Sequence, residues 1–207
     1  MIELIAFLGN PRQEYAKNRH NVGRLLAEFL PFVRSLNWQK KYKGLYAGLD
    51  MLQTSSSGAA PVLETPARFH FLMPETYMNL SGESVQAAAS FFKVPPARIL
   101  VVHDELEIPL GTASFKFSGG LGGHNGLRSI KACFGSPDFW RLRIGIGRPN
   151  HDNISGWVLS DFSAAEKSAL DQVLEAAAAA LTQALLEGPE KLLPEWNKKK
   201  LSIACFD

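Results

Sequence analysis

The sequence predicts a single α/β domain in three layers, with a twisted, mostly parallel mixed sheet and helices on both of its faces. The first observation behind this prediction is that strand-like apolar runs alternate along the chain with helix-like patterns, which is typical of sheets covered by helices. The second is a continuous apolar run at 99–102, because such runs favour strands buried on both faces. The third is the length of 207 residues, with 46% apolar and 20% charged residues, which suits one large core.

The N-terminal third of the chain is expected to supply one helix and four strands. Residues 2–8 are β-rich and end at the turn Asn10-Pro11. Apolar residues then recur with helical spacing from 22 to 30 behind a capping Asn18 or Asn21, and Pro31 ends or kinks that helix. Further strands are expected at 44–52, at 61–64 beyond a Ser-rich turn at 54–58, and at 69–73.

The rest of the chain continues this alternation and ends in a long helix. Ser81 is expected to cap a helix that runs through Phe92 and is stopped by Pro95-Pro96. Strands are expected at 99–102, 113–117 and 142–146, and a glycine-dense loop at 118–126 and a helix from Leu127 separate the last two. An Ala-rich helix follows at 163–186, with a polar tail from about residue 197, and we expect one domain over 1–207.

Cysteine usage and the N-terminal stretch predict a cytoplasmic protein. Cys133 and Cys205 form neither a CxxC pair nor a disulfide framework, which fits a reducing compartment. The apolar N-terminal stretch lacks the basic residues of a signal peptide and stops at Gly9-Asn10-Pro11. Because no apolar run reaches the roughly 18 residues that a membrane span needs, no contact with a membrane is expected.

The positive charge of the chain is concentrated in one strip, which we call the basic strip. From 116 to 148, six basic residues stand against the single acid Asp138, a net charge of +5 where the whole chain carries +2. The same window holds eight of the 17 glycines. Lys and Arg neutralise phosphates, and bare glycine backbone lets phosphates approach, so the strip predicts binding of a polyanion. A solvated surface with loop glycines fits the same pattern.

Several motifs of known chemistry are absent from the sequence. The glycine loop at 119–126 is not followed by the Gly-Lys-Ser/Thr of a Walker P-loop, and it does not fit GxGxxG with a downstream acid. His103-Asp104-Glu105 lacks the PCxxC half of a zinc deaminase. No GxSxG elbow is present and the five histidines form no HExxH. We therefore expect no metal site and no Ser or Cys nucleophile.

Five polar residues are expected to converge at one edge of the sheet. Strands that end after residues 8, 73, 102 and 117 of a largely parallel sheet point the same way, and α/β sheets place ligand sites at that edge. A neutral histidine there can take a proton from water, a carboxylate can hold its other ring nitrogen, and amides can bind carbonyls or an oxyanion. Each residue alone also fits a turn or a helix start, so the residues by themselves indicate a hydrolase that uses water directly, or a binder, acting on something anionic. The five residues are Asn10, His20, Asn79, Asp104 and Asn125.

Four stretches of the sequence, which together extend over nearly the whole chain, resemble the bacterial-type peptidyl-tRNA hydrolase family in order and spacing. The first joins Leu8-Gly9-Asn10-Pro11 to Tyr15 and Arg19-His20-Asn21-Val22-Gly23. The second is 74–82, the third joins His103-Asp104-Glu105-Leu106 to Pro109-Leu110-Gly111, and the fourth joins 122–127 to 141–147. Four linked motifs of this length are far more specific than any one of them alone.

The resemblance implies an activity and a role for each matched residue. Members of the family cleave the ester between a peptide and the 3′ ribose of tRNA, which recycles stalled or dropped-off peptidyl-tRNA. They are cytosolic, typically monomeric, and need no metal, cofactor or obligate protein partner. By this match His20 is the general base, Asp104 the carboxylate that supports it, and Asn10 the residue that discriminates blocked from free aminoacyl-tRNA. The other matched residues contact substrate: Tyr15, Tyr77, Met78, Asn79 and Asn125 at the tRNA end or peptide, and Lys116 and Arg143 at the tRNA 5′-phosphate.

The sequence also departs from the family pattern, and two other functions stay open. Phe7 and Arg12 stand where the family usually has Gly, and Ser118 and Leu121 alter the glycine loop. A non-catalytic RNA-binding relative is one alternative, since an organellar splicing factor resembles the same fold. A different esterase on this scaffold is the other. The matched base and carboxylate and the lack of a transit peptide favour the hydrolase over the first, and the basic strip argues against an uncharged substrate.

Overall fold

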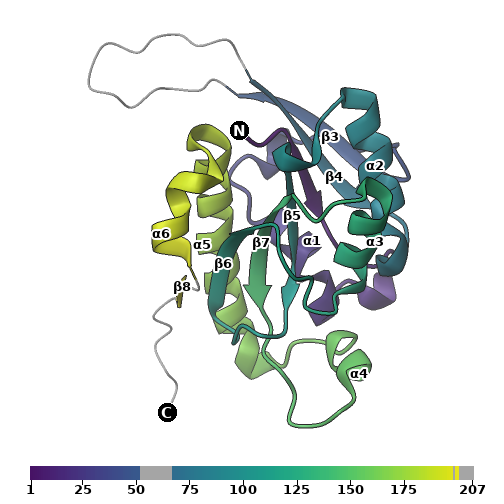
Figure 1. Cartoon of the computed structure of the whole chain (residues 1–207). Coiled ribbons are helices and arrows are strands. Elements are labelled where there is room, and N and C mark those ends of the chain that lie inside the picture. Colours follow the sequence, from purple (N-terminus) through teal and green to yellow (C-terminus); the bar gives the residue numbers. More distant parts are fainter. Residues whose placement is uncertain (52–66, 198, 201–207) are drawn as a thin grey trace, which may run out of the picture.

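The computed structural model describes residues 1–51, 67–197 and 199–200, and its centre is one mixed β-sheet (Figure 1). The strands lie in the order β2-β3-β4-β1-β5-β7-β6-β8. Their bounds are Leu4–Phe7 for β1, Gln39–Lys41 for β2, Gly44–Met51 for β3, Ala67–Pro74 for β4, Ile99–Glu105 for β5, Thr112–Phe117 for β6, Trp140–Gly145 for β7 and Lys199–Lys200 for β8. The strand expected at 61–64 and the turn expected at 54–58 lie outside the described residues.

The direction of the strands confirms a mixed, mostly parallel sheet. The central strands β4, β1, β5 and β7 run parallel to one another. β3 runs against β4 and β6 runs against β7, whereas β2 and β8 reverse again. The expectation that the strand ending at Phe117 points the same way as the others was therefore wrong, because β6 is antiparallel. The chain returns to the edge where β1, β4 and β5 end through the loop that precedes α3.

The helices vary widely in length. The α-helices are α1 Val22–Glu28, α2 Ser81–Phe92, α3 Asn125–Phe134, α4 Ile154–Val158, α5 Ala164–Glu187 and α6 Leu193–Trp196. The short 3-10 helices are η1 Gln13–Tyr15, η2 Arg19–Asn21, η3 Val33–Ser35, η4 Met78–Leu80, η5 Pro96–Arg98 and η6 Pro189–Leu192. In the described part of the chain, none of them combines the length and the apolar character that crossing a membrane requires.

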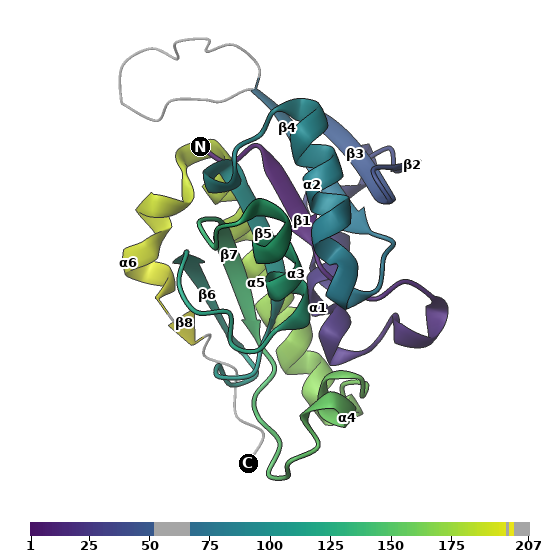
Figure 2. The same cartoon turned by 45° about the vertical axis from the view of Figure 1, so that its right-hand side comes forward.

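Successive side chains of β1 pack into two separate hydrophobic cores. Ile5 and Phe7 pack in a core with residues of α1 and α5, whereas Leu4 and Ala6 pack in a second core with residues of α2 and α3. A strand sends successive side chains to opposite faces of its sheet. Figure 2 shows α2 and α3 in front of the sheet and α1 and α5 behind it. The predicted three layers, with helices on both faces, are confirmed.

The starts of three helices differ from the prediction, either in the side chain that caps the helix or in its first residue. Ser81 is the first residue of α2 rather than its cap, and its Oγ donates to the Met78 carbonyl at 2.9 Å. Asn21 precedes α1, but its side chain accepts a hydrogen bond from the Asn10 backbone at 2.8 Å instead of capping the helix. α3 begins two residues before the predicted start at Leu127, because His124 caps it.

Three short elements escaped the prediction. β2, α4 and α6 have three, five and four residues, too few for a hydrophobic period to be read from the sequence. α4 matters most for function, because it stands at the end of the molecule where β5 and β7 finish (Figure 1). Of the polar tail expected from about residue 197, Lys199–Lys200 form β8 on the edge of β6.

Candidate active site

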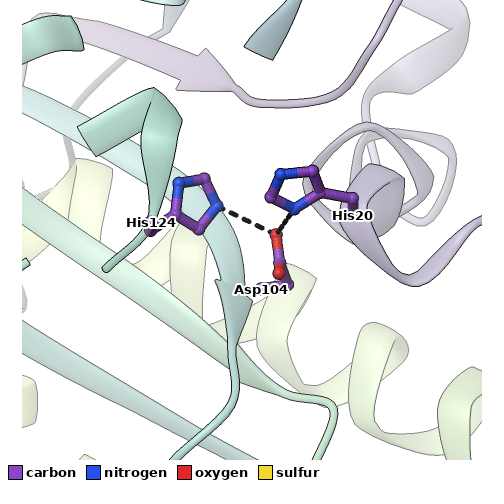
Figure 3. A group of neighbouring side chains, drawn as sticks. All are labelled: His20, Asp104 and His124. Carbon is purple, nitrogen blue, oxygen red and sulfur yellow. Dashed lines mark hydrogen bonds and ion pairs between the residues drawn. The ribbon is translucent and has the colours of Figure 1, made fainter. Parts of the chain in front are cut away.

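Three side chains from distant segments meet at the edge where β1 and β5 end (Figure 3). Asp104 is the last but one residue of β5, His20 lies on η2 at the start of α1, and His124 is the N-cap residue of α3. Their exposed fractions are 3% for Asp104, 8% for His20 and 9% for His124. The sequence predicted the first two at this edge, and we call the three residues the His–Asp–His cluster.

A single carboxylate oxygen joins the two imidazoles. Asp104 Oδ1 lies 2.8 Å from His20 Nδ1 and 2.9 Å from His124 Nε2. The tautomer of His124 follows from its other contacts, because its Nδ1 accepts from the backbone N–H groups of Gly126 at 3.1 Å and Leu127 at 3.4 Å. Its Nε2 therefore carries the proton and donates to Asp104. Against an ionised carboxylate His20 Nδ1 also donates, so a neutral His20 keeps its lone pair on Nε2.

Asp104 stays ionised although it is fully buried. Burial opposes the charged form, but the charge and hydrogen bonds of His124 and His20 outweigh it and hold the pKa of Asp104 well below its usual range. His20 thus faces a permanent negative charge. Such a carboxylate fixes the imidazole ring and stabilises the imidazolium that forms when the ring accepts a proton.

Asn10, directly after the end of β1, is held rigidly beside this cluster. Its backbone N–H donates to Asn21 Oδ1 at 2.8 Å, and its carbonyl accepts from Asn21 Nδ2 at 3.0 Å. Its own Oδ1 accepts from the Met78 N–H at 2.8 Å. Because the amide oxygen is engaged, the Nδ2 group is the part of Asn10 that is oriented to donate to a ligand.

Two cavities lie on either side of η2. His20 borders the first, of about 290 Å³, and its sequence neighbour Asn21 borders the second, of about 370 Å³. Asn125 opens into the first cavity, whereas Asn79 is exposed on η4 and lines neither of the two. The first cavity is lined by His20, Asp104, Glu105, Leu106, Gly122, Gly123, His124, Asn125, Arg148, Ile154, Ser155 and Val158. The second is lined by Asn10, Arg12, Gln13, Ala16, Asn21, Arg24, Leu25, Glu28 and Met73.

Met78 packs beneath the site, where α3 comes close to η4. Its side chain is 4% exposed. A Cβ atom on Gly126 would lie 2.6 Å from Met78 Sδ and 2.8 Å from a methyl carbon of Leu8. Glycine at this position therefore allows the first turn of α3 to pack closely against these two side chains. Met78 therefore acts mainly through packing and through its N–H, which fixes Asn10.

The two candidate tyrosines lie at the rim of the site rather than in the His20 cavity. Tyr15 belongs to η1 and Tyr77 precedes η4 with an exposed fraction of 42%. The guanidinium of Arg12 stands 5.5 Å from the centre of the Tyr77 ring. Arg12 has a φ of 82°, a conformation that glycine adopts most easily.

The arginines of the basic strip differ in what they contact. Arg141 is 1% exposed, and its guanidinium donates to the carbonyls of Ser118, Gly119 and Gly120, so it holds the glycine loop in place. Arg143 donates to Ser114 Oγ at 2.9 Å and lies 3.7 Å from a carboxylate oxygen of Glu105. Lys116 and Arg143 share a third cavity, of about 530 Å³, at the β6–β7 side of the sheet, separate from the His20 cavity. That cavity is also lined by Phe115, Leu193 and Asn197.

The His–Asp–His cluster is also the described group that comes nearest to a metal site, since its ligand atoms lie within 4.8 Å of one another. The donor set does not fit a metal well. His124 Nε2 has to keep its proton, because Nδ1 already accepts two backbone N–H groups. A metal on Nε2 of a neutral ring would turn an N–H of Nδ1 against those donors. The cluster is suited to holding protons.

Sequence reasoning assigned no role to Arg19, which fixes the backbone beside His20. Arg19 is 3% exposed, and its Nη2 lies 2.8 and 2.7 Å from the two carboxylate oxygens of Glu166. Its Nη1 donates to Ser160 Oγ at 2.9 Å, and its guanidinium lies 3.8 Å from the ring centre of Trp157. These partners are more than 130 residues away, so nothing in the local sequence could have revealed the contact. His124 was also missed, although Asp104 is only 20 residues away, because the local sequence does not show that the two side chains meet.

Comparison with known proteins agrees with this site. A family model described as peptidyl-tRNA hydrolase matches residues 4–204. A peptidyl-tRNA hydrolase of Treponema pallidum is 44% identical over 209 residues, which cover 99% of this chain and 98% of that protein. One of Haemophilus influenzae is 42% identical over 204 residues, with 97% and 98% covered.

Solved structures give the same result. The crystal structure of peptidyl-tRNA hydrolase from Acinetobacter baumannii superposes with a TM-score of 0.82 and 34% identity, covering 95% of this chain and 94% of that one. A peptidyl-tRNA hydrolase in complex with N-propanol superposes with a TM-score of 0.84 and 34% identity, covering 97% of both chains. The chain therefore belongs to the peptidyl-tRNA hydrolase family, whose members hydrolyse the ester bond of peptidyl-tRNA.

Proposed function

We propose that this protein hydrolyses the ester between a peptide and the 3′ ribose of tRNA with a water molecule activated by His20. The observation that carries the proposal is the hydrogen bond between His20 Nδ1 and Asp104, which leaves Nε2 unprotonated on a ring that borders the 290 Å³ cavity. Figure 3 supports this, because the second nitrogen of His20 points away from Asp104. An imidazole in this state is a general base suited to neutral pH.

In the proposed reaction one proton moves twice, first from water to His20 and then from His20 to the ribose oxygen. His20 Nε2 takes a proton from water as the water oxygen bonds to the ester carbonyl carbon. The bond from that carbon to the ribose oxygen then breaks, and the proton on Nε2 passes to the ribose oxygen. Asp104 stays ionised throughout and stabilises the transient imidazolium. Peptide acid and free tRNA leave the site.

Asn125 is the better candidate for the group that stabilises the developing oxyanion. Both Asn79 and Asn125 are exposed amides. Asn125 lines the His20 cavity at the first residue of α3, whereas Asn79 does not line it. An amide donor near the N-terminus of a helix stabilises a forming negative charge without adding a counter-charge. Asn79 is then left to contact the tRNA end or the peptide.

Asn10 is placed to recognise an acylated amine. Its Nδ2 group is oriented by the contacts of Oδ1 and of the backbone, and it donates to the carbonyl of a blocked amino acid. A free ammonium offers no acceptor in that position and leaves the amide unpaired. A buried polar group left without its partner discriminates strongly between ligands.

The tRNA end is expected to extend away from the His20 cavity. Tyr15 and Tyr77 provide aromatic faces for unpaired bases of the acceptor end. Lys116 and Arg143 lie in their own cavity, where they can bind the 5′-phosphate. We further propose that the protein acts as a monomer in the cytoplasm, on peptidyl-tRNA released from stalled ribosomes or lost during translation.

The deciding experiment compares an N-acetylated aminoacyl-tRNA with the same aminoacyl-tRNA carrying a free amine. We expect release of the amino acid from the blocked form alone, measured by acid precipitation of labelled substrate. Cleavage of both forms would favour a general esterase, and tRNA binding without cleavage of either form would favour a non-catalytic RNA-binding protein. Either result would overturn the proposal.

A further inference from the structure

We propose that His103 is a positioning residue of the hydrolytic site, which holds His124 against Asp104. The inference deepens the proposed function and rests on it. His103 precedes Asp104 on β5, and strand alternation sends its side chain to the opposite face of the sheet, toward the core that contains α3. It does not line the His20 cavity, so it acts through its neighbours and not on substrate.

Two contacts link His103 to the His–Asp–His cluster. Its Nδ1 lies 2.6 Å from the backbone carbonyl of Asp104. Its ring packs edge-on against the ring of His124, with 5.0 Å between the centres and 76° between the planes. Because Nδ1 faces a carbonyl, it carries the proton, and the ring is held by this hydrogen bond and by packing against His124. His103 is 1% exposed, so it fills the space beneath the first turn of α3, where His124 begins the helix.

We call His103 a spacer, because it stays uncharged and supports the ring of His124 by packing against it. Burial, together with the nearby His124, lowers the pKa of His103 well below its usual range. A charged ring here would place a cation beside Asp104 and weaken the carboxylate that supports His20. The Nε2 atom is buried and has no hydrogen-bond partner among the described residues. An apolar ring would avoid that cost, so the histidine at this position calls for a functional reason.

The position of His124 has a consequence for the pH dependence of the reaction. Each N–H that donates to Asp104 Oδ1 makes this oxygen a weaker partner for the other imidazole. Loss of the His124 contact therefore strengthens the interaction of Asp104 with protonated His20, and the acid limb of the kcat/KM profile moves to higher pH. The other charged groups that face the cluster are Glu105 and Arg148 at the cavity and Arg141, which acts on His103 from β7. They are unchanged in the variants below.

The test is a double-mutant cycle of kcat/KM against pH with N-acetylated aminoacyl-tRNA. His124→Asn keeps a helix-capping oxygen but is too short to reach Asp104, and should move the acid limb upward by about half a pH unit or more. His103→Asn keeps a donor for the Asp104 carbonyl and removes the ring that supports His124, so it should move the limb in the same direction. The double variant should move it no further than His124→Asn alone, because both changes remove one interaction. His151→Ala, at an exposed histidine outside the site, should leave the limb where it is.

Two results would overturn the inference. One is an unchanged acid limb in His103→Asn beside a shifted limb in His124→Asn. The other is additivity of the two shifts, which would mean that His103 acts on the cluster independently of His124. An unaltered protein that cleaves no blocked substrate would instead overturn the proposed function, and this inference with it.

A spectroscopic measurement on the unaltered protein tests the role of His103 even where a variant does not fold. In the imidazole ¹⁵N spectrum of the unaltered protein, His103 should remain a neutral Nδ1–H ring as the pH is lowered through the usual titration range of histidine, and His124 should carry its proton on Nε2. A titrating His103, or a His103 protonated on Nε2, would contradict the spacer role without any assay of hydrolysis.

Discussion

Two members of the His–Asp–His cluster, His20 and Asp104, and the basic strip were singled out from the sequence, yet the charged groups of the cluster and of the strip are used in opposite ways. In the cluster, residues that are isolated in the sequence converge on one carboxylate oxygen. In the strip, residues that are close together in the sequence have different partners. Arg141 donates hydrogen bonds to the glycine loop, Arg143 faces Glu105, and Arg148 pairs with Glu107 at 2.8 Å.

The difference teaches that a count of charges is a poor measure of a binding surface. The net charge of +5 between 116 and 148 includes Arg141, which is buried and binds only backbone carbonyls in the contacts described. Such a residue shapes the fold and adds little to the attraction of a polyanion at contact distance. The cluster carries little net charge, but hydrogen bonds to Asp104 Oδ1 fix both of its imidazole rings, and fixed geometry is what catalysis requires.

Replacing His20 should give the largest effect on either region. His20→Ala removes the proposed base, so turnover of blocked aminoacyl-tRNA should fall by about a hundredfold to ten-thousandfold, while tRNA affinity stays nearly unchanged. Single-turnover hydrolysis and a filter-binding titration measure the two quantities. His151→Ala, at an exposed histidine, is the matched control and should leave both as they are. Retained turnover in His20→Ala would remove this residue as the base.

Replacing the carboxylate should also reduce turnover more than binding. Asp104→Asn keeps the shape of the side chain but removes the charge that stabilises the imidazolium, so kcat should fall by about a hundredfold or more. KM and tRNA affinity should change little. A loss confined to affinity would mean that Asp104 holds substrate and does not support His20.

Asp104 should also link stability to pH. Its pKa is lowered on folding, so its ionised state stabilises the fold above the unfolded-state pKa near 4, and this contribution is lost as the pH falls further. Urea unfolding of the unaltered protein should therefore weaken more steeply between about pH 5 and pH 2 than that of Asp104→Asn. Equal slopes would show that the carboxylate gains no net interaction on folding.

On the basic strip, the largest effect is expected at Arg143. Arg143→Gln should weaken tRNA binding by about tenfold and lower the slope of log K against log salt by about one, because one phosphate contact is lost. Lys116→Gln should behave in the same way. An unchanged salt slope in both variants would count against a phosphate clamp in this cavity.

Arg141 sharpens the contrast with Arg143 because it lies two residues away on the same strand. Arg141→Gln should lower the free energy of unfolding by about 2 kcal/mol, since several carbonyls lose a charged donor. The salt slope of tRNA binding should stay the same as in the unaltered protein. Chemical denaturation and a salt titration test this pair of outcomes, and a reduced slope would place Arg141 at the phosphate after all.

Much of the fold could be predicted because its signals are local. The apolar run of β5, the helical spacing of α1 and the Ala-rich α5 give period and length directly. The direction of β6 could not be predicted, because parallel and antiparallel edge strands have similar sequences. The caps were misassigned for a related reason: Ser81 and Asn21 use their side chains on the neighbouring segments Met78 and Asn10, and a sequence shows only that such a side chain is able to cap.

The sequence by itself determined the three-layer sheet and the family, and it predicted His20, Asp104 and Asn10 as site residues, because apolar period and linked motifs are properties of the order of residues. Only the tertiary structure decided that His124 shares the carboxylate, that Arg19 anchors the turn of His20, and that the arginines of one strip differ in their availability. The reason is physical: hydrogen bonds and burial depend on distances between atoms, and segments a hundred residues apart acquire those distances only when the sheet brings its strand ends together.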